Sequence, residues 1–402
     1  MTILSQTASK SIVRPSILIL VAVTAVNPLA LNLYIPSMPS VQSEFSASAS
    51  MVQLTLSLGL LGTAFIQLLI GPLSDQFGRR PILLGGLVIA VLASFYCALA
   101  PSLDHLIFAR IVQVAGGAAG LVLGRAIVRD THSTNEAASM LGYVTMGMAM
   151  APMIGPVIGG ILDDLWSWRA GFHFTGLFSL AVLIAAWINL SETNQYIGQA
   201  KSPKDLLRDY RQLLGMRPFW VYTAVSAFAA GTFFSFLGAA PYVSRALFDM
   251  SPTEYGLYFI LVAGGYSLGN FFSGRYSALV GLYRMMLVGN LLTLAACSVL
   301  VILSLMSIES PQILFAAMFF LGIGNGVTLP NSNAGVVSVM PRLAGSSSGL
   351  SGSLVTMTAA SASFLVTLVL SDSLLPMGLF MAGCALLALL FGLVSPAVTE
   401  EE

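Results

Sequence analysis

Long apolar runs separated by short polar connections dominate this sequence. Hydrophobic residues make up 56% of its 402 residues and charged residues only 8%, whereas soluble domains are about 25% charged. An apolar helix of roughly 20 residues is long enough to cross the hydrocarbon core of a bilayer. The pattern therefore predicts an all-α membrane protein embedded in a lipid bilayer, and it excludes a soluble enzyme.

Twelve such runs fit along the chain. We place them near residues 16–38, 50–73, 81–100, 104–129, 136–161, 169–190, 218–242, 254–278, 283–306, 311–333, 344–370 and 374–396. The first run lacks a clear small-residue cleavage site, so we expect a retained helix and not a removed signal peptide. The long polar connection at 191–217 predicts an N-terminal six-helix bundle (1–190), a cytoplasmic linker and a C-terminal six-helix bundle (218–402).

The basic residues predict the orientation, because Lys and Arg gather in cytoplasmic loops. If the N-terminus is cytoplasmic, all but three of the 17 Lys and Arg residues fall on or near the cytoplasmic side. Arg169 and Arg245 fall outside, and Arg110 lies within a span. We therefore expect a multi-pass protein with both termini in the cytoplasm.

No pattern in the sequence indicates that the protein binds a metal, a cofactor or nucleic acid. The three cysteines lie inside apolar runs, so we interpret them as small buried hydrophobic residues. The three histidines are far apart and lack metal-ligand spacing. There is no phosphate-binding loop, and a net charge of zero gives no sign of nucleic acid. We expect no metal, no cofactor and no catalytic residues.

A turn rich in glycine and charge follows the second run, with the sequence GPLSDQFGRRP. Gly71 and Gly78 permit close packing and positive φ. Asp75 is an acid suited to a neighbouring helix N-terminus, and Arg79 and Arg80 hold the loop in the cytoplasm. A plain charged turn explains the arginines but not this spacing of glycines and acid, so we expect a role in conformational gating.

A weaker copy of this turn follows the eighth run. Residues 274–281 read GRYSALVG, and their Gly, Ser and Gly match those of 71–78 in register. The two copies lie about half a chain apart, as a duplicated six-helix unit requires. Such repeats place a binding site between the halves, near the midplane of the membrane.

Two further patterns lie inside predicted spans. The run at 104–129 contains Arg110 within the sequence RIVQVAG. The run at 136–161 contains GMAMAPMIGPVIGG. Its small residues let helices approach closely, and its prolines leave kinks that serve as hinges. We assign gating to four residues of this stretch: Gly155, Pro156, Gly159 and Gly160.

Together these segments resemble the Major Facilitator Superfamily, through its signature loop, its intramembrane arginine motif and the glycine motif typical of its exporters. GRAIVRD at 124–130, PYV at 241–243, LPN at 329–331 and PRLAG at 341–345 further resemble the bicyclomycin-resistance type of drug:proton antiporter. The resemblance implies a secondary active exporter of the multidrug-efflux type in the cell inner membrane. It also implies alternating access by two pseudo-symmetric bundles, driven by inward proton flow.

One position departs from that subfamily. The subfamily usually carries an aspartate where Asn32 stands, and that acid is expected to neutralise Arg110 and to carry the proton. Every Asp and Glu of this chain falls in a loop or at the end of a predicted span. His173 is the best intramembrane candidate for proton coupling, because histidine titrates near neutral pH. The alternative is an interfacial histidine without a transport role.

Asn32 and Arg110 lie at similar depth in the membrane and are able to meet. In one interpretation, Arg110 bonds to Asn32, Gln113 and backbone carbonyls as a locking element. In the other, Arg110 binds an anionic group of the substrate. The second interpretation predicts a dedicated exporter of an anionic metabolite, such as a carboxylate siderophore.

The remaining candidates for the substrate cavity are polar or aromatic residues in apolar runs. Buried amides need partners, aromatic rings stack on drug-like solutes, and methionine adapts to many shapes. For a single aromatic residue, packing is the more frequent role. The full cavity set is Asn27, Asn32, Tyr34, Arg110, Gln113, Tyr143, Met146, Phe233, Phe234, Phe236, Asn325 and Asn331.

Three rival functions fit the sequence less well. A membrane enzyme requires a catalytic cluster, and the pair Asp163 and Asp164 reads as a solvated outer turn. An importer conflicts with the exporter-type glycine motif, and a receptor is expected to carry an extra soluble domain. We expect a monomer whose partners are a small-molecule substrate, protons and lipid, and which binds no nucleic acid.

Overall fold

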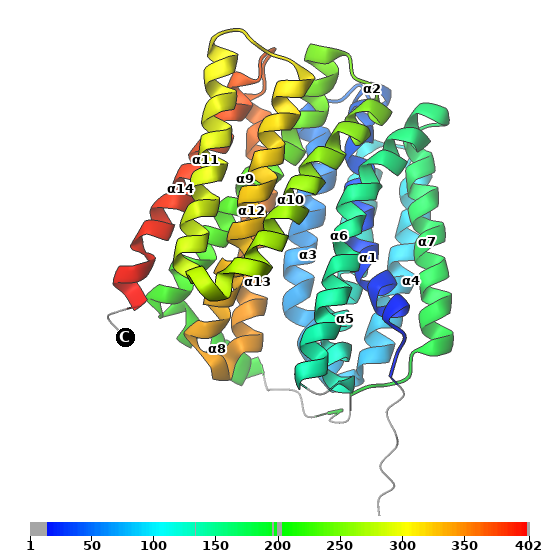
Figure 1. The fold of residues 1–402 in the computed structure, drawn as a ribbon. Coiled ribbons are helices and arrows are strands. Elements are labelled where there is room, and N and C mark those ends of the chain that lie inside the picture. Colours follow the sequence, from blue (N-terminus) through cyan, green and yellow to red (C-terminus); the bar gives the residue numbers. More distant parts are fainter. Residues whose placement is uncertain (1–13, 133, 195–196, 199–202, 400–402) are drawn as a thin grey trace, which may run out of the picture.

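The computed structural model describes residues 14–132, 134–194, 197–198 and 203–399. The chain folds, in order, into α1 (Ile17–Tyr34), η1 (Ile35–Ser37), α2 (Met38–Glu44), α3 (Ala49–Phe77), α4 (Arg79–Ala98), α5 (Leu103–Thr131), α6 (Thr134–Leu165), α7 (Trp168–Asn189), α8 (Pro203–Leu214), α9 (Arg217–Phe248), α10 (Pro252–Val280), α11 (Leu282–Leu305), α12 (Pro311–Val339), η2 (Pro341–Leu343), α13 (Ala344–Leu365), η3 (Val366–Val369) and α14 (Leu375–Thr399). Within the described residues there is no β-strand. The all-α prediction is confirmed (Figure 1).

The twelve long helices correspond to the twelve predicted runs. Eleven of them are long and apolar enough to span a membrane by length and composition. The twelfth, α10, has 29 residues, but glycines, tyrosines and Asn270 dilute its apolar run. Because η1 and α2 continue the first helix past Tyr34, that span ends at Glu44, later than predicted.

Two segments differ from the sequence-based expectation. The GPLSDQFGRRP segment is not a turn throughout, because α3 continues to Phe77 and α4 begins at Arg79. Gly78 alone breaks the helix, with φ of 100°. The predicted linker, 191–217, contains the helix α8, which was not predicted from the sequence.

The duplication of the six-helix unit is visible in the backbone. Gly78 ends α3 and begins α4, and Gly281 ends α10 and begins α11. Their φ values are 100° and 87°, in a region that only glycine adopts readily. Both halves therefore make the same sharp reversal at the same place in the repeat.

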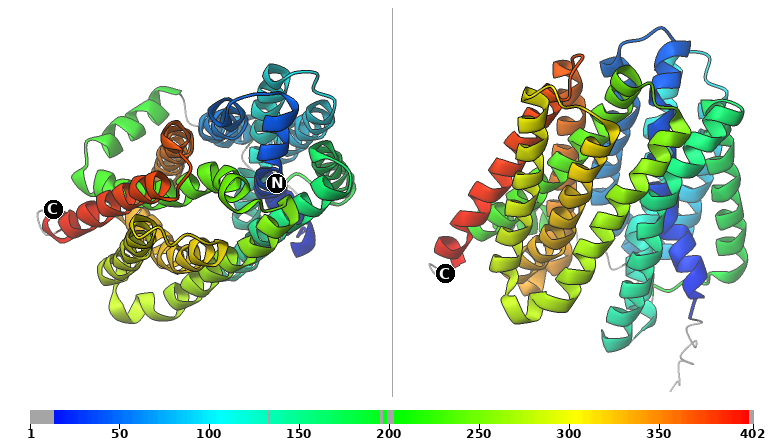
Figure 2. Two further views of the ribbon diagram at one scale, coloured as in Figure 1. Left: turned by 90° about the horizontal axis from the view of Figure 1, so that it is seen from above. Right: turned by 45° about the horizontal axis from the view of Figure 1, so that its top comes forward.

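The helices form two bundles that lie side by side in both views of Figure 2. Helices α1 and α3–α7 pack among themselves, and α9–α14 do likewise. We name the two ends of the molecule by the short helices found there, the α2 end and the α8 end (Figure 1). Four helices that start at the α2 end have serine N-caps, which satisfy free backbone N–H groups. These caps are Ser48, Ser102, Ser251 and Ser310.

The hydrophobic cores differ between the two ends. At the α8 end each bundle has its own cluster, one around Leu83 and Leu123 and another around Phe219 and Met286. At the α2 end two clusters contain residues of both bundles. One joins Tyr34 with Tyr242 and Ala360, and the other joins Ile35 with Phe236 and Tyr255. The bundles are thus packed together at the α2 end and have separate cores at the α8 end.

Candidate functional site

Arg110 lies at the centre of the polar interior of the first bundle. Its side chain is 0% exposed. Its Nη1 donates hydrogen bonds to the carbonyl of Ala30 at 3.0 Å and to Oε1 of Gln113 at 2.7 Å. The guanidinium also lies over the rings of Tyr34, at 4.7 Å from the centroid, and Phe172, at 5.5 Å. Nε and Nη2 have no partner among the described residues.

These contacts explain how a cation is held here without an acid. An arginine deep in a membrane costs about 2.5–3.5 kcal/mol on insertion scales. A hydrogen bond from a charged group contributes roughly 1.5–3 kcal/mol, and a desolvated cation–π contact contributes about 2 kcal/mol. Two hydrogen bonds and two rings are therefore enough to offset the cost. No described carboxylate forms an ion pair with Arg110.

A short chain of hydrogen bonds fixes the partners of Arg110. Gln113 donates through Nε2 to the hydroxyl of Ser94 at 2.7 Å, which orients its Oε1 toward the guanidinium. The hydroxyl of Tyr34 accepts a bond of 3.0 Å from Thr55 on α3. The structure thus brings together Tyr34, Arg110 and Gln113, which belong to the predicted cavity set.

Asn32 does not join this cluster. Its amide donates to the carbonyl of Pro28 at 2.8 Å, within α1, and its Oδ1 has no partner among the described residues. Its Cβ lies against Gly155 of α6. Asn27 also bonds elsewhere, donating to the carbonyl of Val114 on α5 at 2.8 Å. The expected bond between Asn32 and Arg110 is therefore not formed in this structure.

The predicted aromatic residues of the second bundle occupy different environments. Phe236 is 0% exposed and packs against Phe259 and Phe315, so in this structure it is a core residue. Phe233 and Phe234 contact each other edge to face. Phe234 packs against both of the clusters that the two bundles share, whereas Phe233 packs against one. Phe234 is therefore the member of this trio with the most extensive contact at the junction of the bundles.

The two predicted asparagines of α12 tie that helix to its neighbours. Asn325 donates to the carbonyl of Ala229 on α9 at 3.0 Å, and its Oδ1 has no partner among the described residues. Asn331 donates to the hydroxyl of Ser273 on α10 at 2.9 Å. Both are 2% exposed, so their bonds hold the second bundle together.

Three other candidates lie apart from these groups. Tyr143 on α6 is exposed. The side chain of Met146 lies outside the described residues. His173 on α7 is exposed, with its ring beside Phe95, whereas its neighbour Phe172 is buried against Arg110.

The glycine-rich part of α6 packs on two helices at once. A Cβ on Gly159 would lie 1.8 Å from the carbonyl oxygen of Leu33 on α1, and one on Gly160 would lie 2.2 Å from that of Pro252 on α10. A Cβ on Gly256 of α10 would lie 2.4 Å from the carbonyl oxygen of Pro156. Since α1 and α10 belong to different bundles, this stretch of α6 joins the bundles by direct backbone contact at the α2 end.

A network of charges surrounds Gly78 at the α8 end. Arg79 pairs with Asp75 at 2.5 Å and with Asp130 at 3.0 Å, and it also donates to the hydroxyl of Ser74. Arg80 donates to the carbonyl of Trp187 and lies over the indole ring. All the hydrogen-bond partners named here lie in the first bundle. Gly71 has open space beside it.

Glu192 is a member of this network that the sequence analysis missed. Its carboxylate accepts hydrogen bonds from the backbone N–H groups of Arg79, at 2.9 Å, and Arg80, at 3.1 Å. It thus caps the N-terminus of α4, a role that suits an anion. Asp75, expected at a helix N-terminus, pairs with Arg79 instead. The sequence signal that could have identified Glu192 is its position as an acid directly after the apolar run at 169–190.

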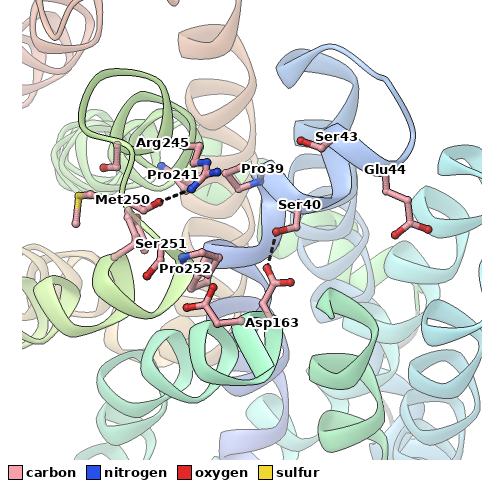
Figure 3. Close-up of a pocket in the computed structure, with 14 residues that line it drawn as sticks. Pro39, Ser40, Ser43, Glu44, Asp163, Pro241, Arg245, Met250, Ser251 and Pro252 are labelled. Carbon is pink, nitrogen blue, oxygen red and sulfur yellow. Dashed lines mark hydrogen bonds between the residues drawn. The ribbon is translucent and has the colours of Figure 1, made fainter. Parts of the chain in front are cut away.

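Cavities lie between the bundles at both ends, and a smaller one of about 300 Å³ lies between α2 and α9. The cleft at the α8 end has a volume of about 470 Å³ and is lined by Asp75, Arg79 and Arg129 on one side and by Tyr210 and Arg342 on the other. Burial raises the pKa of Tyr210, which keeps its hydroxyl protonated. The cavity at the α2 end has a volume of about 620 Å³ (Figure 3). Asp163 and Asp164 line this cavity from the last turn of α6 and do not form a separate loop.

Two bundles of membrane-spanning helices, joined at one end and separated by a cleft at the other, define a membrane transporter. The family model of the Major Facilitator Superfamily matches residues 20–362. The chain belongs to this superfamily, as its motifs predicted, and it is a multi-pass membrane protein.

Individual proteins show the same relationship. The chain is 30% identical to an uncharacterized MFS-type transporter, YdgK, of Bacillus subtilis, over 93% of this chain and 94% of the other. It is 32% identical to a chloramphenicol resistance protein of Pseudomonas aeruginosa, over 79% and 75%. It is 25% identical to a bicyclomycin resistance protein homolog of Haemophilus influenzae, over 90% and 91%. These relatives confirm the predicted drug-efflux branch of the superfamily.

A solved structure shares the fold. A bacterial homolog of the human lysosomal transporter Spinster, in an inward-facing and occupied conformation, superposes with a TM-score of 0.73 over 96% of each chain, at 14% identity. This likeness shows the fold alone.

Proposed function

We propose that the protein is a secondary active exporter of small organic molecules in the cell inner membrane, of the multidrug-efflux type. The observation that carries the proposal is the interface between the bundles. At the α2 end α6 packs directly on α10, and at the α8 end a cleft of about 470 Å³ lies between the bundles. The names of two relatives support chloramphenicol and bicyclomycin as the first substrates to test.

The α8 end is the cytoplasmic end in this proposal, and both termini are cytoplasmic. The arginines and lysines at that end support the assignment, among them Arg79, Arg80, Lys204 and Arg342. A membrane-impermeant maleimide tests it in whole cells. Ser307→Cys, in the loop between α11 and α12, should react, and Lys204→Cys on α8 should react only after the cells are opened. The reverse pattern would overturn the orientation.

Alternating access follows if the bundles 1–190 and 218–402 rock as two bodies, with 191–217 as the linker. The gating residues are those around Gly78 and those of the glycine stretch of α6. Gly155 and Gly159 pack on α1 and keep α6 within its own bundle, while Pro156 and Gly160 contact α10 across the interface. To open the α2 end, only the contacts of Pro156 and Gly160 with α10 have to separate.

Arg110 acts in this proposal as a locking element of the first bundle and not as a substrate ligand. Its full burial, its bonds to Gln113 and Ala30, and its position over Tyr34 support that role. Of the predicted cavity residues, Phe234 has the strongest support as a substrate contact, since it lies at the junction of the bundles. The burial of Arg110 also gives no support to the alternative of an exported anionic metabolite.

The proton gradient is the proposed energy source, and a monomer is the proposed functional unit. One charge crossing about 100 mV releases about 2.3 kcal/mol. That free energy supports roughly a 50-fold concentration gradient, at 1.4 kcal/mol per tenfold. His173 remains the candidate proton carrier from the sequence, although its exposure beside Phe95 places it apart from the Arg110 cluster.

The decisive experiment measures drug accumulation in a bacterial strain that lacks its own efflux pumps. Cells that express the protein should hold several-fold less labelled chloramphenicol than cells with an empty vector, and a protonophore should abolish the difference. Equal accumulation of both chloramphenicol and bicyclomycin would contradict drug efflux. Comparing the solutes that the two strains secrete would then test the metabolite alternative.

A further inference from the structure

The helix α8 lies across the end of the second bundle, whereas the long helices run along it. The view along the bundles shows α8 from its side, at the rim of the second bundle (Figure 2, left). It packs on α9 and α13. The candidate membrane span α9 begins at Arg217, directly after the short connection that follows α8. The helix α8 therefore lies at the level where the membrane meets water.

The apolar residues of α8 form one face that the protein covers only in part. Leu213 is buried in the core cluster of the second bundle, and Leu206 and Tyr210 line the cleft. Leu207 and Leu214 continue this face, but they are 68% and 40% exposed. At 3.6 residues per turn, the five side chains fall within about a third of the helix circumference. Part of one continuous apolar face is thus left uncovered.

Basic residues border the uncovered side of this face. Lys204 and Arg211 follow the exposed leucines around the helix, and Arg208 lies beyond them. The two acids, Asp205 and Asp209, lie toward the other border. Arg208 pairs with Asp205 at 3.6 Å. Lys204 and Arg211 are exposed, and neither forms an ion pair with a described residue.

An aromatic residue stands at the same level. Trp220, in the first turn of α9, is 45% exposed. Its indole N–H donates a hydrogen bond of 2.8 Å to the carbonyl of Leu214, the last residue of α8. Tryptophan is enriched where membranes meet water. The bond therefore ties the uncovered end of α8 to the start of a membrane span.

Exposed leucines beside unpaired cations match the two parts of an anionic phospholipid. Helices that lie in the membrane surface bury leucines at the boundary between headgroups and acyl chains, and their Lys and Arg attract anionic lipids. The bilayer surrounds the second bundle at whose rim α8 lies. Its lipids are the partner that is in place to cover the apolar face and to neutralise its cations.

We propose that α8 lies in the headgroup layer of the membrane and is a binding site for anionic phospholipid. Leu207 and Leu214 insert among the acyl chains, while Lys204 and Arg211 bind the lipid phosphate. None of these four residues lines the cleft, so the site is separate from the export pathway. It depends on the chain being a membrane protein and not on the solute that it exports.

The first test measures whether the uncovered side of α8 is immersed in lipid. Spin labels are placed at Leu207→Cys and, on the other side of the helix, at the exposed Gln212→Cys, with the three native cysteines replaced by alanine. The purified full-length protein is held in nanodiscs of phosphatidylglycerol and phosphatidylcholine. We expect the accessibility to oxygen, relative to a water-soluble nickel complex, to be several-fold higher at 207 than at 212.

The second test measures the preference for anionic lipid. Native mass spectrometry counts the lipids retained by the purified full-length protein after incubation with equal amounts of phosphatidylglycerol and phosphatidylcholine of the same acyl chains. A basic residue near an anionic surface contributes about a fivefold preference. The double variant Lys204→Gln and Arg211→Gln should therefore lose at least about fivefold in its preference for phosphatidylglycerol. The charge-conserving variant Lys204→Arg and Arg211→Lys should keep it.

The proposal is wrong if labels at 207 and 212 are equally accessible to the nickel complex, a result that would leave the exposed leucines to a cytoplasmic protein partner. It is also wrong if the double glutamine variant prefers phosphatidylglycerol as the wild type does. If that variant does not fold, the accessibility at 207 decides alone. Neither measurement involves transport, so failure here is distinguishable from failure of drug efflux.

Discussion

The two ends of the bundle interface are held by different forces. At the α2 end the bundles meet through glycines and backbone carbonyls, as at Gly160 and Pro252, and through two shared apolar clusters. At the α8 end each bundle has its own core, and a charged network ties the first bundle to itself. Steric fit holds the α2 end closed. At the α8 end, ion pairs stabilise the first bundle.

This difference indicates where each kind of mutation should act. A close-packed backbone contact has no room for an added atom. A side chain added to one of its glycines should therefore break the contact completely. A partly buried charged network loses only part of its free energy when one member is removed. Variants at the α2 end should therefore change the equilibrium between open and closed states, and variants at the α8 end should mainly change stability.

Gly160→Val should have the largest effect. The new Cβ would lie 2.2 Å from the carbonyl of Pro252, which is backbone and cannot turn aside. Overpacking of this kind costs typically 1–3 kcal/mol, and here it acts against closure of the α2 end. We expect chloramphenicol accumulation to rise to the level of cells without the protein.

Gly264→Val is the matched control, because it adds the same side chain on α10 where nothing lies within 4 Å. It should export normally. Gel filtration and thermal unfolding of Gly160→Val separate a folded inactive protein from an unfolded one. A folded Gly160→Val variant with half or more of wild-type export would contradict the steric role of this contact.

Arg79→Ala should have the next largest effect. It removes bonds to Asp75, Asp130 and Ser74, and it leaves the partly buried Asp130 without its cation. We expect a loss of about 1–3 kcal/mol in the free energy of unfolding, since Arg79 is mostly buried. Thermal unfolding of the purified protein measures the change.

Arg80→Ala is the comparison for this prediction. Arg80 has the same charge, but the partners of its side chain among the described residues are a carbonyl and an exposed indole ring, so its loss should cost less than about 1 kcal/mol. Equal destabilisation by the two variants would show that net charge, and not the Arg79 network, stabilises the α8 end.

The sequence predicted those features that depend on periodicity or on a special residue. Twelve apolar runs gave twelve long helices, and the repeated glycines gave the sharp reversals at Gly78 and Gly281. The helix α8 was not predicted, because only the polar and charged residues of the linker were considered. The apolar residues Leu206, Tyr210 and Leu213 recur there at helical spacing.

The polar interior was less predictable for a geometric reason. The rise of 1.5 Å per residue fixes how deep a side chain lies, but packing decides which neighbour it faces. We predicted a contact between Asn32 and Arg110 only because they lie at similar depth in the membrane. Asn32 instead faces Gly155 on α6, and Arg110 lies over Tyr34 and Phe172. The capping of α4 by Glu192 likewise depends on how two loops meet.

Ser363→Ala should have a moderate effect on the α2 end. Its hydroxyl accepts a hydrogen bond across the interface from Gln53 on α3, and both residues are 0% exposed. A net hydrogen bond is worth about 0.5–1.5 kcal/mol, so the ratio of closed to open molecules should fall by up to about tenfold. Spin labels at Ser46→Cys and Ser307→Cys, on loops of opposite bundles at this end, report the change as a larger long-distance fraction.

Ser361→Ala is the control for that experiment. Its hydroxyl bonds within α13, to the carbonyl of Met357, and it is exposed. It should leave the distance distribution unchanged. If Ser363→Ala also leaves it unchanged, the apolar clusters and the glycine contacts hold the α2 end closed without this bond.

His173→Gln should have the smallest effect. The side chain is exposed and its ring lies beside Phe95, outside both the bundle interface and the Arg110 cluster. We therefore expect less than about twofold change in export and an unchanged response to the protonophore, measured against His105→Gln, an exposed histidine in the first turn of α5. Export that becomes insensitive to the protonophore only in His173→Gln would identify His173 as the proton carrier. Coupling would then occur at the surface of the first bundle, and the comparison of the two ends would no longer account for gating by itself.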